Sequence, residues 1–280
     1  SLSRAWLQDE IITVMRMPHE VKVERRLACR YVKIELLAES YYDFVFADFN
    51  FQAQTSATGS VPELAEGTDP MIKKINDIGL KTLAECMQTV YEDGPKRDQR
   101  LWIGDLYLEA LANAYSYKNH TLTRRCLYLI AGMTPDNGFV RGTVYEHLPE
   151  RPDMGLHVMD YSLLYGVALY EYFKETNDRE TAEELWPVVK HQVEFARNYL
   201  KNNVFDVEMQ PQYWLVFDWK DELNRHAPMQ GLMTFAIEQS YELAKMLGRE
   251  AEVADWPKVL KDMRKASRET FYDKKLGVMK

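Results

Sequence analysis

The sequence has few cysteines and none of the short motifs that mark metal or nucleotide sites. Its three cysteines, Cys29, Cys86 and Cys126, are widely spaced and form no CxxC pair. This argues against a zinc knuckle and a disulfide framework, so we expect each to be a small buried apolar residue. HExxH, GxSxG, Walker A and GxGxxG motifs are also absent. We therefore expect no metal site, and no cofactor is indicated.

Long apolar runs and an excess of basic residues are missing too. No stretch approaches the roughly 18 uninterrupted apolar residues of a membrane span. Residues 1–10 contain no apolar region of the kind found in signal peptides. Asp and Glu number 43 against 35 Lys and Arg, a formal charge of −8. Nucleic-acid binders normally present a basic surface, so we expect neither nucleic acid nor a membrane as partner.

Aromatic residues, in contrast, are plentiful. The chain has 17 Tyr, 11 Phe and 6 Trp, together 12% of its residues. Many of these rings will belong to the core. Trp and Tyr beside carboxylates are also what a sugar-binding cleft requires, because pyranose faces stack on rings while hydroxyl groups bond to acids.

The first 60 residues and the rest of the chain have different patterns. Val32, Ile34 and Leu36 alternate with polar or amphipathic neighbours, which predicts β-strands within about the first fifty residues. Two or three strands cannot bury a sheet face alone, so this segment is either the end of a β-domain or an extension packed on the rest of the chain. Residues 52–69 are polar and rich in small residues, which is typical of a linker. We therefore divide the chain into residues 1–60 and residues 61–280.

Helices dominate the second part. Apolar spacing near three and four, with capping residues and Gly or Pro stops, predicts seven helices at about 69–93, 105–117, 122–132, 158–175, 181–200, 228–248 and from 251 onward. We expect Pro187 to kink or restart the fifth helix and Pro257 to interrupt the seventh. The pattern predicts a loop with a short hairpin at residues 134–144, and an extended segment with a turn at residues 272–280. No strand-helix-strand alternation occurs, so a bundle, a solenoid or an α/α toroid is expected.

One helix-to-helix connection concentrates charge and aromatic character. Residues 93–105, the signature segment, read Asp-Gly-Pro-Lys-Arg-Asp-Gln-Arg-Leu-Trp-Ile-Gly-Asp. One interpretation is a solvated turn, in which Asp93 starts a turn, Asp98 pairs with an arginine and Asp105 caps the next helix. Trp102 favours a functional interpretation, because a large ring on a polar loop usually covers a specific surface. Arg97 could then hold one acid ionised, while burial against Trp102 keeps another protonated.

The signature segment resembles that of the α-L-rhamnosidases of glycoside hydrolase family 78, in the subgroup reading Asp-Gly-x-Lys-Arg-Asp-x-x-x-Trp-x-Gly-Asp. Residues 30–35 resemble the last β-sandwich strands before the catalytic domain of that family. Thr82, Leu83 and Cys86 precede the signature at the expected interval. Residues 160–178 and 218–219 resemble later family segments, so the resemblance covers most of the chain.

The resemblance implies an (α/α)6 barrel, preceded by a β-sandwich tail, that hydrolyses terminal α-L-rhamnosides with inversion. It requires a carbohydrate substrate and no cofactor, and it is compatible with a periplasmic or secreted location. By position, Asp93, Arg97, Trp102 and Asp105 match sugar-contacting residues and Asp98 matches the proton donor. Many relatives carry Glu as the donor, some within Arg-Asp-Glu. Here Gln99 follows Asp98, so either Asp98 is the acid or acid function is weakened, and we favour Asp98.

Further substrate-binding candidates lie later in the chain. Asp160 begins an apolar helix, so helix capping is its alternative role. Asp218 and Trp219, with Trp214 nearby, lie in an aromatic connection, where loop packing is the alternative to a stacking platform. Tyr161 and Tyr165 are expected to line the barrel or belong to the core.

The general base cannot be assigned from the sequence. In this family it is a Glu in a later helical region, and seven helices are little more than half of twelve. We therefore expect the chain to be truncated at its C-terminus, which leaves its activity in isolation open, together with its oligomeric state. The alternatives are another (α/α)6 enzyme, such as a glucuronyl hydrolase or lyase, and a non-catalytic helical sugar-binding module.

Overall fold

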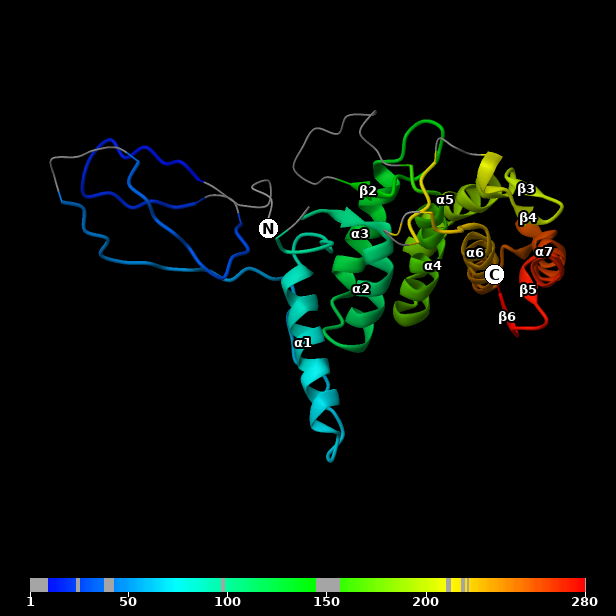
Figure 1. Cartoon of the computed structure of the whole chain (residues 1–280), viewed down its shortest axis with the longest axis horizontal. Coiled ribbons are helices and arrows are strands. Elements are labelled where there is room, and N and C mark those ends of the chain that lie inside the picture. The colour runs from blue at the N-terminus through cyan, green and yellow to red at the C-terminus, as the bar shows by residue number, and fades with distance from the viewer. Residues whose placement is uncertain are drawn as a thin grey trace.

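Seven α-helices form most of the described structure (Figure 1). The computed structural model describes residues 10–23, 26–37, 43–96, 99–144, 157–209, 213–217, 220 and 222–279. The helices are α1 (Pro70–Cys86), α2 (Ile103–Tyr115), α3 (His120–Gly132), α4 (Met159–Thr176), α5 (Arg179–Arg197), α6 (His226–Leu247) and α7 (Trp256–Phe271). Among the described residues, 3-10 turns lie at Val207–Met209 and Glu250–Val253. The predicted mainly α fold is thus confirmed.

Alternate helices pack against one another. α4 contacts α2 and α6 as well as its sequence neighbours α3 and α5, and α3 also contacts α5. α2, α4 and α6 therefore form one layer, and α3, α5 and α7 lie against it (Figure 1). This arrangement of successive hairpins is that of an α/α toroid, one of the architectures that the helical pattern predicted.

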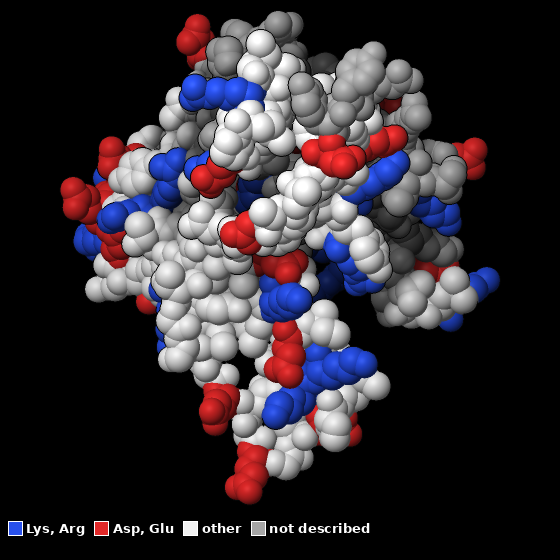
Figure 2. All heavy atoms as spheres, turned by 90° about the vertical axis from the view of Figure 1, so that its left-hand side faces the viewer, with Lys and Arg blue, Asp and Glu red and all other residues white. Residues whose placement is uncertain are grey.

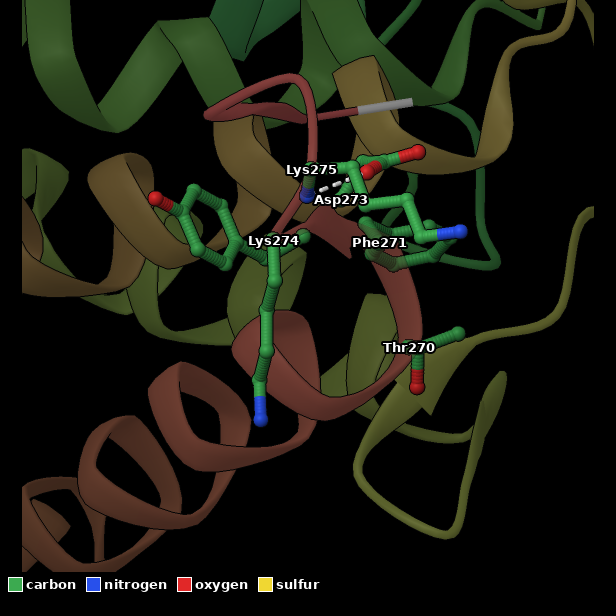
Figure 3. Close-up of a pocket in the computed structure, with 6 residues that line it drawn as sticks. Thr270, Phe271, Asp273, Lys274 and Lys275 are labelled. Carbon is green, nitrogen blue, oxygen red and sulfur yellow. Dashed lines mark hydrogen bonds between the residues drawn. The ribbon is translucent and has the colours of Figure 1, made fainter.

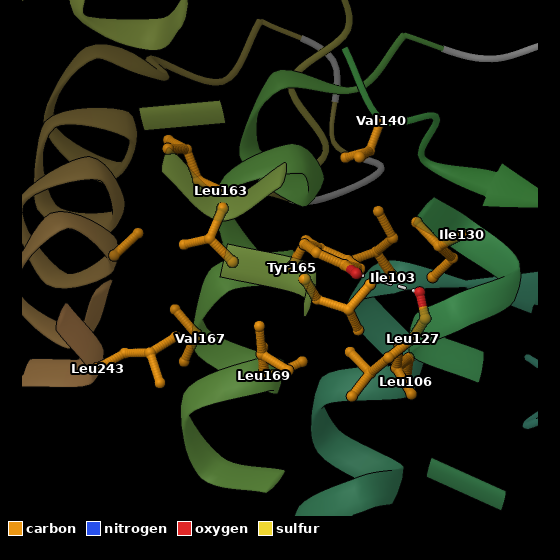
Figure 4. Packing of buried hydrophobic residues seen from close by; sticks show 14 of the residues in the cluster. Ile103, Leu106, Leu127, Ile130, Val140, Leu163, Tyr165, Val167, Leu169 and Leu243 are labelled. Carbon is orange, nitrogen blue, oxygen red and sulfur yellow. Dashed lines mark hydrogen bonds between the residues drawn. The ribbon is translucent and has the colours of Figure 1, made fainter. Parts of the chain in front are cut away.

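The core is centred on α4, whose side chains are buried on nearly every side because other helices surround it. Leu163, Tyr165 and Val167 point into this core (Figure 4), and the Tyr165 hydroxyl donates a 3.1 Å hydrogen bond to the carbonyl of Leu127 on α3. Gly166 lets α4 approach α5 and α6. A Cβ at this position would lie 2.8 Å from side-chain atoms of Ser240 and Val189.

Three predictions about individual helices can be compared with the structure. α1 ends at Cys86 rather than near residue 93, because residues 87–91 turn back and bury Met87 and Tyr91, which bridge to each other. Pro187 lies exposed within a continuous α5, where water can bond the carbonyl that the proline leaves unpaired. Pro257 lies in the first turn of α7, a position that needs no amide hydrogen, and so begins the helix rather than interrupting it.

Within the described part of the chain, three two-stranded antiparallel sheets accompany the helices. β1 (Leu101–Trp102) pairs with β2 (Thr143–Val144), β3 (Leu200–Lys201) with β4 (Val204–Phe205), and β5 (Tyr272–Asp273) with β6 (Val278–Met279). The last pair confirms the extended segment and turn that were expected near the C-terminus. The hairpin expected within residues 134–144 is replaced by the long-range pairing of β1 with β2.

The described residues between 10 and 60 are extended but contain no strand. Val32, Ile34 and Leu36, which were expected to alternate in a sheet, are each about half exposed, at 53%, 49% and 56%. A strand requires a hydrogen-bonded neighbour, and these described residues provide none for each other. Cys29 is exposed, so the expectation of a buried cysteine is wrong there, while Cys86 and Cys126 are buried as expected.

Charge is mixed over the surface. Figure 2 shows Lys and Arg interspersed with Asp and Glu over the described part of one face. Within the described residues, no helix is both long and apolar enough to cross a membrane.

Candidate functional site

The signature segment begins with a turn closed by two hydrogen bonds. The backbone N–H of Asp93 donates to the carbonyl of Arg100 at 3.1 Å, and the N–H of Arg100 donates to Asp93 Oδ1 at 3.3 Å. The two ends of the turn are therefore held together, with the half-buried Asp93 carboxylate committed in part to the backbone. Arg97 and Asp98, the predicted sugar contact and proton donor, lie outside the described residues.

Strand β1 and the start of α2 position the second half of the signature. Trp102 pairs with Thr143 across the small sheet, and α2 starts at the next residue. The Arg100 guanidinium lies over the Trp102 ring, 4.6 Å from its centroid, as a cation–π pair. Tyr161, at the start of α4, meets the same ring edge-on with centroids 6.1 Å apart. Trp102 is thus held between a cation and a second ring from a distant helix.

Gly104 makes this aromatic contact possible. A Cβ added at Gly104 would lie 2.5 Å from the Tyr161 ring, a distance that side-chain carbons do not tolerate. The glycine of the signature therefore has a steric role, which is to let Tyr161 pack against the beginning of α2.

Asp105 and Glu109 lie one turn apart on α2, on the same face. Burial raises the pKa of the Asp105 carboxyl. Burial, and then the charge of Asp105, raise the pKa of Glu109 to about 9, although a hydrogen bond with Cys86 opposes the shift. Glu109 Oε2 is buried without a hydrogen-bond partner among the described residues. At neutral pH, Glu109 is therefore a neutral acid beside Asp105.

Asp160 connects the start of α4 with residues 213–217. It is almost fully buried, and its Oδ2 accepts a 2.8 Å hydrogen bond from the N–H of Val216. Burial raises the pKa of Asp160 to about 6, opposed by that hydrogen bond and by the charge of Arg225. The N-cap of α4 is Val158, so Asp160 lies inside the first turn, and its Oδ1 is buried without a partner among the described residues.

Tyr161 lies within the electrostatic influence of three of the predicted acids. Its pKa rises to about 12, first through burial and then through the negative charges of Asp105, Asp160 and Asp93. Asp93, Trp102 and Asp105 belong to the signature, and the fold brings Tyr161 of α4 to them. The set combines carboxylates, two of them with raised pKa values, and two aromatic rings in contact, which suits binding of a polyhydroxylated ligand.

The aromatic connection before α6 is described only in part. Asp218 and Trp219 lie outside the described residues. Trp214 is 50% exposed, yet its backbone is fixed by hydrogen bonds with His157 and Met159, at 2.8 Å and 3.0 Å. Residue 214 therefore presents an exposed ring on a well-anchored backbone beside α4.

Two members of the site were not predicted from the sequence. Glu109 belongs to no motif, although its spacing of four from Asp105 indicates that both lie on one face. Tyr161 was expected to line the barrel or belong to the core; it is half-buried, and it contacts the Trp102 ring of the signature, which was not expected. Tyr165, in contrast, is a core residue as expected.

Other regions of the described structure offer fewer groups suited to catalysis or sugar binding. No group of three or more His, Cys, Asp or Glu suited to a metal ion occurs within the described part of the chain. An open groove of about 470 Å³ lies where α7 meets the β5–β6 hairpin (Figure 3), lined by Thr270, Phe271, Tyr272, Asp273, Lys274 and Lys275. The Asp273 carboxylate accepts the N–H of Lys275 at 2.8 Å and so closes the turn. This groove lies on α7, apart from the signature segment on α2 (Figure 1).

Comparisons with known proteins cover both parts of the chain. Residues 1–53 match the model of the glycosyl hydrolase family 78 alpha-rhamnosidase N-terminal domain. Residues 64–280 match the bacterial alpha-L-rhamnosidase 6 hairpin glycosidase domain. A search of curated proteins finds no match.

Solved structures are similar over most of this chain. A rhamnosidase from Klebsiella oxytoca with rhamnose bound is 36% identical, with a TM-score of 0.74 over 80% of this chain and 43% of that one. A GH78 family rhamnosidase of Bacillus sp. GL1 is 20% identical, with a TM-score of 0.66 over 79% of this chain and 22% of that one. A Streptomyces avermitilis alpha-L-rhamnosidase complexed with L-rhamnose is 19% identical, with a TM-score of 0.65 over 81% of this chain and 21% of that one. The latter two establish the fold alone, and the chain spans less than half the length of each relative.

Proposed function

Because the chain belongs to the bacterial α-L-rhamnosidases with a six-hairpin glycosidase domain, of glycoside hydrolase family 78, we propose that the protein hydrolyses terminal α-L-rhamnosides. The observation that carries the proposal is the edge-on contact of Tyr161 with the Trp102 ring of the signature, where burial and the charges of Asp105, Asp160 and Asp93 raise the pKa of Tyr161. Sugar hydroxyl groups require several acceptors on one side, and a pyranose face requires a flat ring.

We assign the role of general acid to Asp98. In an inverting mechanism, this carboxyl donates its proton to the leaving glycosidic oxygen while a second carboxylate activates water on the opposite face of the sugar. The assignment rests on the position of Asp98 in the signature. No described residue is assigned as the general base, which must lie roughly 6.5–9.5 Å from the acid to leave room for that water.

The remaining signature residues are assigned to sugar binding. Asp93 and Asp105 would accept hydrogen bonds from sugar hydroxyls, Arg97 would donate to them, and Trp102 would cover an apolar sugar face. Asp160, Asp218 and Trp219 are assigned to the same substrate-binding set. The half-buried state of Asp93 and Asp105 supports these roles, because partly desolvated carboxylates bond hydroxyl groups more strongly than fully hydrated ones.

Hydrolysis of 4-nitrophenyl α-L-rhamnoside by the purified protein tests the proposal. Proton NMR during the first minutes identifies the anomer released, and inversion predicts β-L-rhamnose. Asp98→Asn should lower the rate by at least about a hundredfold, while Asp136→Asn, on an exposed turn, should leave it unchanged. Retention of the α-anomer, or unaltered turnover by Asp98→Asn, contradicts the mechanism.

L-rhamnose binding separates the alternatives. Calorimetric binding without turnover of any aryl glycoside would favour a sugar-binding module, and activity on an unsaturated glucuronide alone would favour another toroid enzyme. We also propose that the domain boundary lies near residue 60, between residues 1–60 and 61–280. Brief proteolysis should then cut first close to this position.

A further inference from the structure

We propose that Arg26, which precedes the helical domain, is a positioning residue that holds the acidic signature turn in place by pairing with Glu92. Its effect on sugar binding rests on the proposed function, whereas its effect on the turn does not. Arg26 would act through the protein rather than by touching the sugar.

Two contacts join Arg26 to the turn. Its Nη2 forms an ion pair with Glu92 Oε2, and its Nη1 donates a 3.5 Å hydrogen bond to the carbonyl of Pro95. The two side chains are largely shielded, with exposures of 20% for Arg26 and 9% for Glu92. One guanidinium therefore reaches the residue before the signature and the third residue within it.

The linker is fastened to the same region. The N–H of Ser56 donates to the carbonyl of Met87 at 2.7 Å, and the Gln88 side chain donates to the carbonyl of Gln54 at 2.9 Å. Asn119, which caps α3, donates to the carbonyl of Ser56 at 2.8 Å. Residues 54–56, which follow Arg26 in the N-terminal part of the chain, are thus tied to residues 87–88, shortly before the turn.

Electrostatics explains why a cation is needed here. Glu92 is 7% exposed, and its negative charge acts on the buried Cys86 and Glu109, alongside Asp93. Removing a cation from beside a buried carboxylate disfavours the charged group in its buried position and favours its movement toward water. Movement of Glu92 would displace Asp93, its neighbour, and with it the closure of the turn at Arg100.

Arg26 therefore couples the N-terminal segment to the signature. The pair fixes where the turn begins, and the two bonds between Asp93 and Arg100 fix where it closes. Glu92 and Asp93 are adjacent, so a shift of one cannot leave the other in place. Through this pair, the N-terminal segment acts on the position of the signature turn.

A double-mutant cycle on the full chain tests this inference. Arg26→Ala is compared with Arg26→Lys, Glu92→Gln and the double variant, with Arg30→Ala as the matched control on an exposed arginine. Two quantities are measured for each, the midpoint of thermal unfolding and the Kd for L-rhamnose at a temperature where every variant is folded. Circular dichroism verifies folding.

We expect Arg26→Ala to weaken L-rhamnose binding about tenfold, a coupling typical of contacting charged groups. Arg26→Lys should recover part of the loss, and the double variant should bind better than Arg26→Ala, because a neutral glutamine depends less on a nearby cation than the Glu92 carboxylate does. Arg30→Ala should match the unmodified protein. Equal Kd values for Arg26→Ala and the unmodified protein, or no rescue by Glu92→Gln, would overturn the inference.

The unfolding midpoints separate this inference from the proposed function. If the unmodified protein does not bind L-rhamnose, the proposed sugar site fails, and the midpoints alone then decide whether Arg26 and Glu92 are coupled. If the changes in midpoint caused by the Arg26 and Glu92 substitutions are not additive, they support the role of Arg26 in holding the turn. If they are additive, they overturn it.

Discussion

Replacing Glu109 by glutamine removes the carboxyl group with the largest pKa shift in the site and keeps the size of the side chain. Burial, followed by the charge of Asp105, raises the pKa of Glu109 from 4.5 to about 9. Between these values the folded chain holds a proton that the unfolded chain has released. The free energy of unfolding therefore falls as the pH rises through this range, and the contribution is lost progressively above pH 4.5.

The size of this effect on the free energy of unfolding follows from the pKa shift of Glu109. Each pH unit is worth about 1.36 kcal/mol, so the cost of Glu109 reaches about 3 kcal/mol at pH 7. Glutamine cannot ionise and escapes this cost. Glu109→Gln should therefore be more stable than the unmodified protein by about 3 kcal/mol at pH 7 and equally stable near pH 4.5.

Urea unfolding followed by tryptophan fluorescence at pH 5, 6, 7 and 8 measures the difference. Glu85→Gln is the matched control, because Glu85 is exposed on α1 and belongs to no buried cluster. The stability gained by Glu109→Gln should widen with pH, while that of the control should stay constant. A gain that is the same at pH 5 and pH 8 would refute the idea that the fold keeps Glu109 protonated.

Three further predictions concern packing and hydrogen bonds, all measured by urea unfolding. Gly104→Ala should lower the free energy of unfolding by about 1–3 kcal/mol, because the added Cβ would clash with the Tyr161 ring. Gly132→Ala should leave the free energy of unfolding unchanged, because no atom lies within 4 Å of the added Cβ. Equal effects of the two would contradict the steric role. Asp160→Ala should be less stable than Asp160→Asn by about 1–3 kcal/mol, because only asparagine retains an acceptor for the Val216 amide. Equal stability would show that this bond contributes nothing. Tyr165→Phe should lose about 1 kcal/mol with its buried hydrogen bond, and no loss would contradict that bond.

Helix positions were largely predictable because they depend on local chemistry. Asp69 before Pro70 predicted the start of α1, and the Asp69 carboxylate does accept the N–H of Met71 at 2.7 Å. Gly248 predicted the end of α6, where it adopts a positive φ of 71°. The early end of α1 was not predictable in this way, because Val90 continues the apolar spacing of the helix although tertiary packing places it beyond a turn.

The site was predictable in composition more than in arrangement. The spacing of Asp93, Trp102 and Asp105 indicated a cluster on one connection. Tyr161 lies far along the chain, and nothing in its own neighbourhood distinguishes it from the buried Tyr165 one turn later. Only the packing of α4 on α2 reveals which tyrosine faces the acids.

The sequence by itself determined the helical class, the family resemblance and the acidic signature, because periodicity, capping and motif spacing are properties of neighbouring residues. The tertiary structure decided which groups share an environment. Burial raises the pKa of Glu109, and the packing of α4 on α2 places the Tyr161 ring against Gly104. A contact between distant segments pairs Arg26 with Glu92. These effects arise from desolvation and contact between distant segments, and both depend on how helices pack rather than on the order of residues along the chain.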